Sequence, residues 1–345
     1  MGVNAAVAHS GENTLAGRHI LSAEDFSAAE IGLVLSATRV MEQDATGERE
    51  FRSLLQGKTL TTAFFEPSTR TRLSFESAML RLGGQVSSIQ YGRSSSSEKG
   101  ESLQDMGRIL SGYADIVAMR HPDKGSVAAF ASTASVPVIN AGDGANQHPT
   151  QALLDLYTVF LEKGTLDGLT VGFIGDLKYS RTVHSLISLL RHYQVTFHCI
   201  SDPPLALPDS IKRSLAERGQ TFQESRELRK ALPDLDVLYV TRVQKERFAD
   251  PLEYEQSNRN YLLNRDTLRR SKPDLVLLHP LPRLQEIHPE LDSDPRAKYF
   301  RQAHNGVYVR MALLALLLGE FPVCRTWSPD LGFRRSPESE QLAET

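Results

Sequence analysis

The sequence predicts an α/β protein with two doubly wound domains, each built on a mainly parallel sheet. Short apolar segments of strand composition alternate with segments of helical periodicity along most of the 345 residues, which is the pattern of parallel βαβ units. The length suits about two domains, each with its own core. Polar or charged residues directly follow several predicted strands, and open α/β sheets bind ligands at those carboxyl ends.

The composition is that of a globular protein without strong charge. A formal net charge of −3 gives no overall attraction to nucleic acid or to an acidic membrane, so local Arg, Lys and His clusters have to bind any anionic ligand. Cys199 and Cys324 lack CxxC spacing, so we expect no disulfide or zinc site, and a cytoplasmic location. The longest apolar run, residues 311–318, is too short for a membrane span, and we expect neither membrane insertion nor secretion.

The most informative segment joins a predicted strand to a predicted helix. Thr and aromatic residues at 58–65 are typical of a strand, and Phe75, Ala78 and Met79 then recur at helical spacing up to the glycines at 83–84. The first helical turn is Ser68-Thr69-Arg70-Thr71-Arg72. Unpaired amides and the positive dipole end favour a phosphate there, and the hydroxyl and guanidinium groups add to this. An ordinary N-cap with solvated arginines is the alternative.

The segments before and after this unit have weaker signals. Residues 1–17 are small and polar and predict a loose tail. Residues 22–25 have the form of a capping box for a first helix that continues through Ile31. Residues 94–101 are hydrophilic and predict a surface loop, which on composition alone is a solvated linker.

Two further strands of the first unit end at polar residues. A helix from Ser102 leads to a strand at 115–119, which is followed by Arg120. The next strand leads to a glycine-containing loop in which His148 and Gln151 flank a helix start at Pro149. We give equal weight to a structural role and to a functional role for His148.

A second unit begins near residue 167. Its 172–176 turn lacks GxGxxG spacing, and the chain has no GxxxxGK[ST] loop, so neither a dinucleotide nor an ATP site is supported. Strands are predicted at 169–174, 195–200, 237–241 and 275–278, with helices at 181–192 and 299–318. The last helix is expected to cross back to the first domain, and residues beyond about 323 to form a tail.

The polar residues at strand ends and helix starts form one set. It comprises Ser68, Thr69, Arg70, Thr71, Arg120, His148, Gln151, Arg181, Arg242 and Gln244. Several cations without a carboxylate pair suit small ligands with several negative charges and do not suit glycoside hydrolysis. No catalytic nucleophile with a partner base is evident, so the chemistry should rest on positioning and electrostatics.

Several motifs of this chain resemble the aspartate and ornithine carbamoyltransferases. The three signatures are Ser68-Thr69-Arg70-Thr71-Arg72, His148-Pro149-Thr150-Gln151 and His279-Pro280-Leu281-Pro282-Arg283. The segments 119–122, 175–178, 181–186 and 241–247 are similar to the aspartate branch. The resemblance runs in order from about residue 18 to 320.

The resemblance implies carbamoyl transfer from carbamoyl phosphate to L-aspartate in de novo pyrimidine biosynthesis, with the active site in the cleft between the domains. By position, Ser68, Thr69, Arg70 and Thr71 would hold the phosphate. Thr71, Arg120 and His148 would polarise the carbamoyl oxygen, while Gln151 and the carbonyls of Leu281 and Pro282 would bind its amino group. Arg181 and Arg242, with Gln244, would bind the aspartate carboxylates.

The resemblance also implies domain limits and an assembly. Residues 18–150 with 303–323 would bind carbamoyl phosphate, residues 151–302 would bind aspartate, and 1–17 and 324–345 would be flexible tails. The polar loop would reach a neighbouring subunit, so that Ser95 and Lys99 act in trans in a homotrimer. No cofactor or metal is implied, and regulatory or pathway-enzyme partners stay open.

Two alternatives remain at the level of sequence. An ornithine carbamoyltransferase binds a cationic side chain, so its pocket should avoid an arginine at Arg242, and that branch has a cysteine near the Leu281-Pro282 pair. The second alternative is a catalytically silent homologue that acts as a binding subunit. The chain has a candidate site residue at every motif position, which argues against it. Glu98 stands where some relatives have a second lysine before Lys99, which leaves the charge of that loop open.

Overall fold

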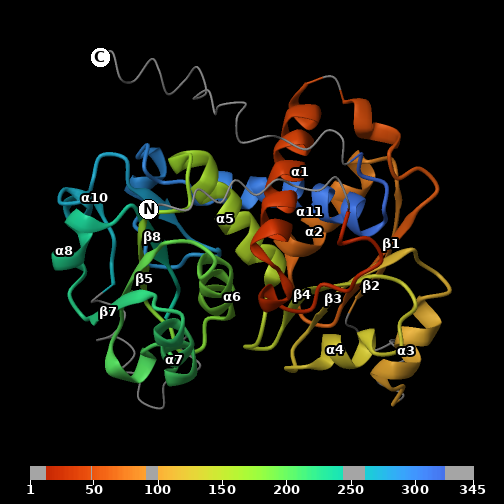
Figure 1. Cartoon of the computed structure of the whole chain (residues 1–345), viewed down its shortest axis with the longest axis horizontal. Coiled ribbons are helices and arrows are strands. Elements are labelled where there is room, and N and C mark those ends of the chain that lie inside the picture. The colour runs from red at the N-terminus through yellow and green to blue at the C-terminus, as the bar shows by residue number, and fades with distance from the viewer. Residues whose placement is uncertain (1–12, 48, 91–99, 244–260, 323–345) are drawn as a thin grey trace, which may run out of the picture.

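The computed structural model describes residues 13–47, 49–90, 100–243 and 261–322. It has two lobes, each with a sheet between layers of helices (Figure 1). All strand pairs in both sheets are parallel. The predicted fold class, with two doubly wound parallel-sheet units, is therefore confirmed. Across these described ranges, no helix combines the length and apolar content of a membrane span.

The first sheet has the order β2-β1-β3-β4. Its strands are β1 Thr59–Phe64, β2 Gln85–Gln90, β3 Ile116–His121 and β4 Val138–Asp143. The covering helices are α1 Ala28–Thr46, α2 Thr69–Arg81, α3 Leu103–Leu110 and α4 Ser126–Ala131. Apolar residues of α1 and α2 pack on one face of the sheet, and those of α3 and α4 pack on the other. The strand β2 and the helix α4 were not predicted, because neither has strong periodicity.

The second sheet has the order β7-β6-β5-β8-β9. Its strands are β5 Thr170–Ile174, β6 Thr196–Ile200, β7 Thr221–Ser225, β8 Val237–Val240 and β9 Val276–Leu278. Its helices are α6 Arg181–Leu190, α7 Asp209–Glu217, α8 Leu228–Ala231 and α10 Arg265–Leu268. Short 3-10 helices lie at Ala23–Asp25, Glu50–Ser53, Pro203–Leu205, Leu232–Asp234 and Pro289–Ser293. The edge strand β7 was missed because its residues are polar and mostly exposed.

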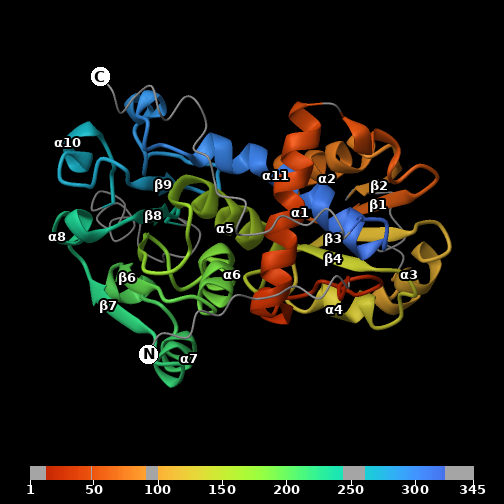
Figure 2. The same ribbon diagram turned by 45° about the horizontal axis from the view of Figure 1, so that its top comes forward.

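Two long helices connect the lobes (Figures 1 and 2). They are α5, Pro149–Lys163, and α11, Tyr299–Leu317. Both are buried over most of their length and pack against each other, which confirms that the last helix crosses back to the first lobe. The domain limits expected at residues 150 and 302 fall inside these helices, so the two lobes share a continuous core.

The N-terminal region differs from the sequence-based expectation in two ways. Ser22 caps only the short 3-10 helix Ala23–Asp25, and a second capping box, from Ser27 to Glu30, starts α1. Residues 13–17 are not part of a loose tail, because Leu15 is fully buried and the Gly17 amide donates to the carbonyl of Leu317. The rest of the N-terminal tail and the tail at 324–345 lie outside the described residues.

The carboxyl ends of β5 and β8 approach each other closely at Gly175. This residue has a φ of 110°, and a Cβ atom there would lie 2.3 Å from the carbonyl oxygen of Thr241. The Thr241 hydroxyl donates to the carbonyl of Ile174, which holds the two strand ends together. Only glycine fits this point, from which the chain continues to Arg181.

We expect Gly175→Ala to destabilise the protein by about 3 kcal/mol, because the new methyl group clashes with backbone and the φ angle disfavours an L-residue. Thermal unfolding followed by circular dichroism measures the loss. The control is Gly164→Ala, at a φ of 71°, where an added Cβ atom would have no neighbour within 4 Å; it should cost only about 1 kcal/mol. Equal losses in the two variants would show that the contact with Thr241 does not matter.

Candidate active site

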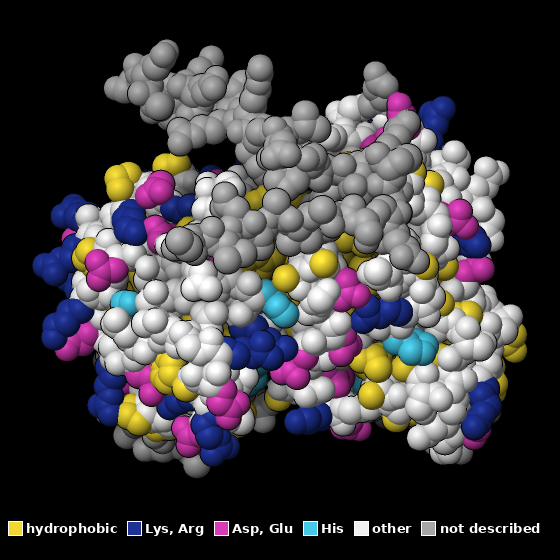
Figure 3. All heavy atoms as spheres, in the orientation of Figure 1, with side chains coloured by type: hydrophobic (Ala, Val, Ile, Leu, Met, Phe, Trp, Pro, Cys, Tyr) yellow, Lys and Arg dark blue, Asp and Glu magenta, His cyan; other side chains and the backbone are white. Residues whose placement is uncertain are grey.

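A cleft of about 400 Å³ lies between the two lobes. Ten of the predicted site residues line it: Ser68, Thr69, Arg70, Thr71, Arg120, His148, Gln151, Arg181, Leu281 and Pro282. They come from the start of α2, the ends of β3 and β9, and the starts of α5 and α6. Basic and histidine side chains gather where the lobes meet in the space-filling view (Figure 3). The structure therefore brings together residues that are more than 200 positions apart in the sequence.

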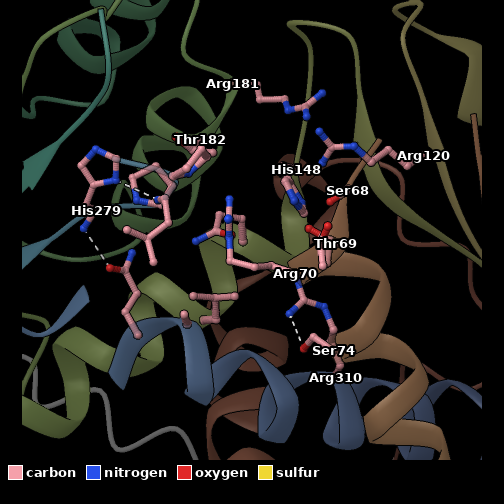
Figure 4. A pocket seen from close by; sticks show the side chains of 18 of the residues that line it. Ser68, Thr69, Arg70, Ser74, Arg120, His148, Arg181, Thr182, His279 and Arg310 are labelled. Carbon is pink, nitrogen blue, oxygen red and sulfur yellow. Dashed lines mark hydrogen bonds between the residues drawn. The ribbon is translucent and has the colours of Figure 1, made fainter. Parts of the chain in front are cut away.

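The start of α2 forms one wall of the cleft. Ser68 is the N-cap residue, with extended backbone, and its side chain makes no capping hydrogen bond. Thr69 and Arg70 are exposed, and Thr71 is buried one position further along the helix. In the close view, Ser68, Thr69 and His148 lie beside one another (Figure 4). The amides of the first turn and these hydroxyls thus stand together at a helix start, which is the geometry that favours an anion.

Arg120 and Arg181 extend toward each other from opposite lobes (Figure 4). Their approach depends on Gly142, since a Cβ there would lie 3.0 Å from Cζ of Arg181 and 3.2 Å from Nη1 of Arg120. The carboxylate of Glu66 lies between them, with Oε2 3.0 Å from Nε of Arg120 and 3.6 Å from Nη2 of Arg181. One carboxylate thus joins a cation of the first lobe to a cation of the second.

The positive charges of Arg120 and Arg181 are only partly offset by Glu66. Burial, the charge of Arg181 and the charge of Arg70 lower the pKa of Arg120 to about 10, against the opposing effect of Glu66. Burial also lowers the pKa of Arg181. Glu66 is the only acidic side chain that lines the cavities formed by these described residues. A ligand with several negative charges would therefore stabilise the cations where they stand.

His148 is held as a neutral, buried group. It is the N-cap residue of α5, and its backbone amide donates to Ser185 Oγ at 3.0 Å. The Ser185 hydroxyl donates in turn to the side chain of Gln147 at 2.9 Å. Burial and the charges of Arg181, Arg120 and Arg310 hold the pKa of His148 well below its usual value. The uncharged ring has one N–H group to donate to a ligand oxygen.

The turn after β9 forms the wall opposite α2. Leu281 has a φ of 57°, and its peptide bond to Pro282 is cis. The Leu281 amide donates to Nδ1 of His279 at 2.8 Å, and Nε2 of His279 lies 2.8 Å from Oε1 of Glu286. Since the ring accepts at Nδ1, its proton lies on Nε2 and points to the carboxylate. The buried His279 and Glu286 side chains therefore fix the shape of the turn.

A second cavity of about 440 Å³ adjoins the first. It is lined by Glu66 and Arg242 and shares Arg120, Arg181 and Thr182 with the first. Arg242 is partly buried at the end of β8, as predicted from the sequence. The other predicted residues of this half, Ser95, Lys99 and Gln244, lie outside the described residues. Among the residues that are described, no group of three His, Cys, Asp or Glu side chains could hold a metal ion.

Glu66 and Arg310 at the cleft were not predicted from the sequence. Glu66 adjoins the Ser68 motif and was not assigned a role, because its partners are distant in sequence. Arg310 is fully buried in α11 and donates to Ser74 Oγ at 2.9 Å (Figure 4) and to Thr150 Oγ1 at 3.1 Å. A single charge beside the apolar run 311–318 was the available signal for it.

The chain matches two family models in order. Residues 18–160 match the aspartate/ornithine carbamoyltransferase carbamoyl-P binding domain, and residues 167–317 match the Asp/Orn binding domain of the same family. A protein named aspartate carbamoyltransferase catalytic subunit from Thermococcus gammatolerans is 51% identical over 303 residues, which is 88% of this chain and 98% of the relative. One of that name from Methanopyrus kandleri is 49% identical over 308 residues, covering 89% and 99%.

Solved structures agree with these sequence matches. The catalytic subunit of M. jannaschii aspartate transcarbamoylase superposes with a TM-score of 0.83 at 47% identity, covering 88% of this chain and 98% of that one. The aspartate transcarbamoylase of Trypanosoma cruzi in complex with N-(phosphonacetyl)-L-aspartic acid superposes with a TM-score of 0.84 at 39% identity, covering 89% and 98%. The protein described here therefore belongs to the aspartate/ornithine carbamoyltransferase family.

Proposed function

We propose that the protein transfers the carbamoyl group of carbamoyl phosphate to the amino group of L-aspartate, giving N-carbamoyl-L-aspartate and phosphate. The observation that carries this proposal is the pair of adjoining cavities that share Arg120 and Arg181. One cavity holds the anion-binding start of α2, and the other holds Arg242. Two neighbouring anion sites suit a phosphorylated donor and a dicarboxylate acceptor. Relatives named for this activity are about half identical to the chain.

In the proposed arrangement, the first lobe binds the donor. The amides and side chains of Ser68, Thr69, Arg70 and Thr71 hold the phosphate. Thr71, Arg120 and neutral His148 polarise the carbamoyl oxygen, while Gln151 and the carbonyls of Leu281 and Pro282 accept hydrogen bonds from the carbamoyl amino group. The division into donor domain 18–150 with 303–323 and acceptor domain 151–302 is part of this proposal, and the packing of α11 against α1 and α2 supports placing its residues with the donor domain. The two family models instead break between residues 160 and 167.

Chemistry follows from this alignment. Arg181 and Arg242, with Gln244, hold the aspartate carboxylates so that the deprotonated amine attacks the carbamoyl carbon. A C–N bond forms, the oxyanion is stabilised by the groups that polarised the carbonyl, and the C–O bond to phosphate breaks. The leaving phosphate takes up the amine proton. Alignment of two reactants is worth roughly 7–11 kcal/mol and one oxyanion donor about 3–4 kcal/mol, so positioning is the larger contribution.

The proposal extends to assembly and context. By the family resemblance, Ser95 and Lys99 reach the cleft of a neighbouring subunit in a homotrimer. The reaction belongs to de novo pyrimidine biosynthesis in the cytoplasm. A reducing compartment fits Cys199, whose buried thiol is free and has a pKa raised to about 12 by burial and by nearby Glu224.

The direct test is an assay of the purified protein with carbamoyl phosphate and either L-aspartate or L-ornithine. We expect N-carbamoyl-L-aspartate from aspartate and no citrulline from ornithine, because Arg242 repels a cationic side chain. Citrulline as the main product would identify the ornithine branch. The absence of both products would identify a binding subunit.

We expect Arg242→Ala to raise the KM for aspartate roughly 10- to 100-fold, since one charge-assisted hydrogen bond is worth about 1.5–3 kcal/mol. The KM for carbamoyl phosphate should stay within about threefold, because its phosphate lies in the other cavity. Steady-state kinetics measure both constants, with Arg213→Ala, an exposed cation of α7, as the control. An unchanged aspartate response would remove Arg242 from the acceptor site.

Sharing of the site between subunits is tested by mixing two inactive variants. Arg70→Ala should lower turnover by roughly 100-fold or more, through loss of a phosphate ligand, and Lys99→Ala should do likewise from the neighbouring subunit. After subunit exchange, mixed trimers should regain part of the activity, because some clefts then hold both intact residues. Confirmed exchange without recovery would contradict delivery of Lys99 in trans.

A further inference from the structure

A buried acid that the mechanism above does not use lies behind the cleft. Asp155, one turn after Gln151 in α5, has no exposed surface and accepts three side-chain hydrogen bonds. Oδ1 accepts from Nε2 of Gln151 at 2.8 Å and from Nε2 of Gln302 at 2.6 Å. Oδ2 accepts from the hydroxyl of Tyr239 at 2.8 Å. Three elements, α5, α11 and β8, thus meet at one carboxyl group.

The orientation of these amides follows from a backbone donor. The amide N–H of His279 can only donate, and it donates to Oε1 of Gln302 at 2.9 Å. The NH₂ group of Gln302 therefore points to Asp155, so Oδ1 of Asp155 must be an acceptor. Gln151 bonds to the same oxygen and must also present its NH₂ group to it.

The amide of Gln151 is therefore oriented by Asp155. One N–H of its NH₂ group donates to Asp155, and its carbonyl oxygen is the acceptor that it can present to a ligand in the cleft that it lines. Gln302 extends the same hydrogen-bond network to His279, because it accepts a hydrogen bond from the His279 amide. The ring of His279 in turn accepts a hydrogen bond from the amide of Leu281. One acid thus supports both groups that, under the proposed function, accept hydrogen bonds from the carbamoyl amino group.

We propose that Asp155 is the positioning residue through which the cleft recognises the amino group of carbamoyl phosphate. This inference rests on the proposed function and adds the source of its donor selectivity. In this role Oδ1 of Asp155 acts as a hydrogen-bond acceptor for the amide of Gln151, and the negative charge of the carboxylate is not required. A different role is charge balance for buried Arg310, whose pKa is lowered by burial and raised by Asp155, although the two side chains share no hydrogen bond or ion pair within the described residues. A substitution of Asp155 that keeps the acceptor oxygen but removes the charge distinguishes the two roles.

The test compares carbamoyl phosphate with acetyl phosphate, in which a methyl group replaces the amino group. Dissociation constants are measured by isothermal titration calorimetry on the full chain. The wild type should prefer carbamoyl phosphate. Asp155→Leu, which removes both acceptors, should lower that preference roughly tenfold or more, since one hydrogen bond is worth about that factor. Affinity for acetyl phosphate and for inorganic phosphate should change less than about threefold.

Asp155→Asn separates the two roles, because asparagine keeps an oxygen at Oδ1 and loses the charge. We expect the preference in this variant to stay within about threefold of wild type. The matched control is Thr158→Val, which removes a buried hydrogen bond from Asn305 between the same two helices, 2.9 Å long and outside the network. It should lower the melting temperature without changing the preference.

The following results would overturn either the role of Asp155 or the proposed function. An unchanged preference in Asp155→Leu, or an equal loss of affinity for all three ligands, would overturn the inference, as would a loss in Asp155→Asn as large as in Asp155→Leu. If Asp155→Leu does not fold, Gln302→Met takes its place, with a smaller expected loss of preference, because it breaks the branch to His279 and leaves the bond from Gln151 to Asp155; an unchanged preference in it would overturn the inference. A wild-type protein that forms no N-carbamoyl-L-aspartate would refute the proposed function itself, which is a separate result.

Discussion

The structure depends on holding several guanidinium groups close together in one cleft between the lobes. Arg120 and Arg181 come from different lobes and approach across Gly142, where an added Cβ atom would make tight contacts with both guanidinium groups. Burial and mutual repulsion disfavour their charges, and Glu66 offsets this only in part. Such an arrangement is stable at low cost only when an anion completes it. The two lobes therefore present a cluster of cations that an anion would stabilise.

The fold supplies this arrangement through two features. Parallel sheets place the ends of β3, β8 and β9 along facing edges, so that loop residues converge on the cleft. The helices α5 and α11 pass through both lobes; they carry Asp155 and Arg310 in their buried faces, and buried His148 caps the start of α5. A polar network inside an apolar helix pair is costly unless every group is satisfied. Its presence beside the cleft indicates a positioning role.

Sequence patterns predicted the parts of this site that are local. The Ser68 motif at a helix start and the strand-end residues Arg120 and Arg242 follow from short-range rules, and the structure places all of them at the cavities. Glu66 and Asp155 were missed because their roles arise from partners more than 50 residues away. The identity of an acidic residue in the sequence does not show whether its carboxylate is solvated or buried. The strand β7 was missed because its side chains are polar and exposed, so apolar alternation is absent.

The proposed function places phosphate at the start of α2 and two carboxylates across the lobe boundary. A crystal structure of this protein with N-(phosphonacetyl)-L-aspartate tests it most directly, because the ligand carries both kinds of anion. We expect the phosphonate on the amides and side chains of Ser68 to Thr71, and the carboxylates on Arg181 and Arg242. The ligand carbonyl should lie beside His148. A phosphonate bound away from the start of α2, or carboxylates that contact neither arginine, would refute this arrangement of the site.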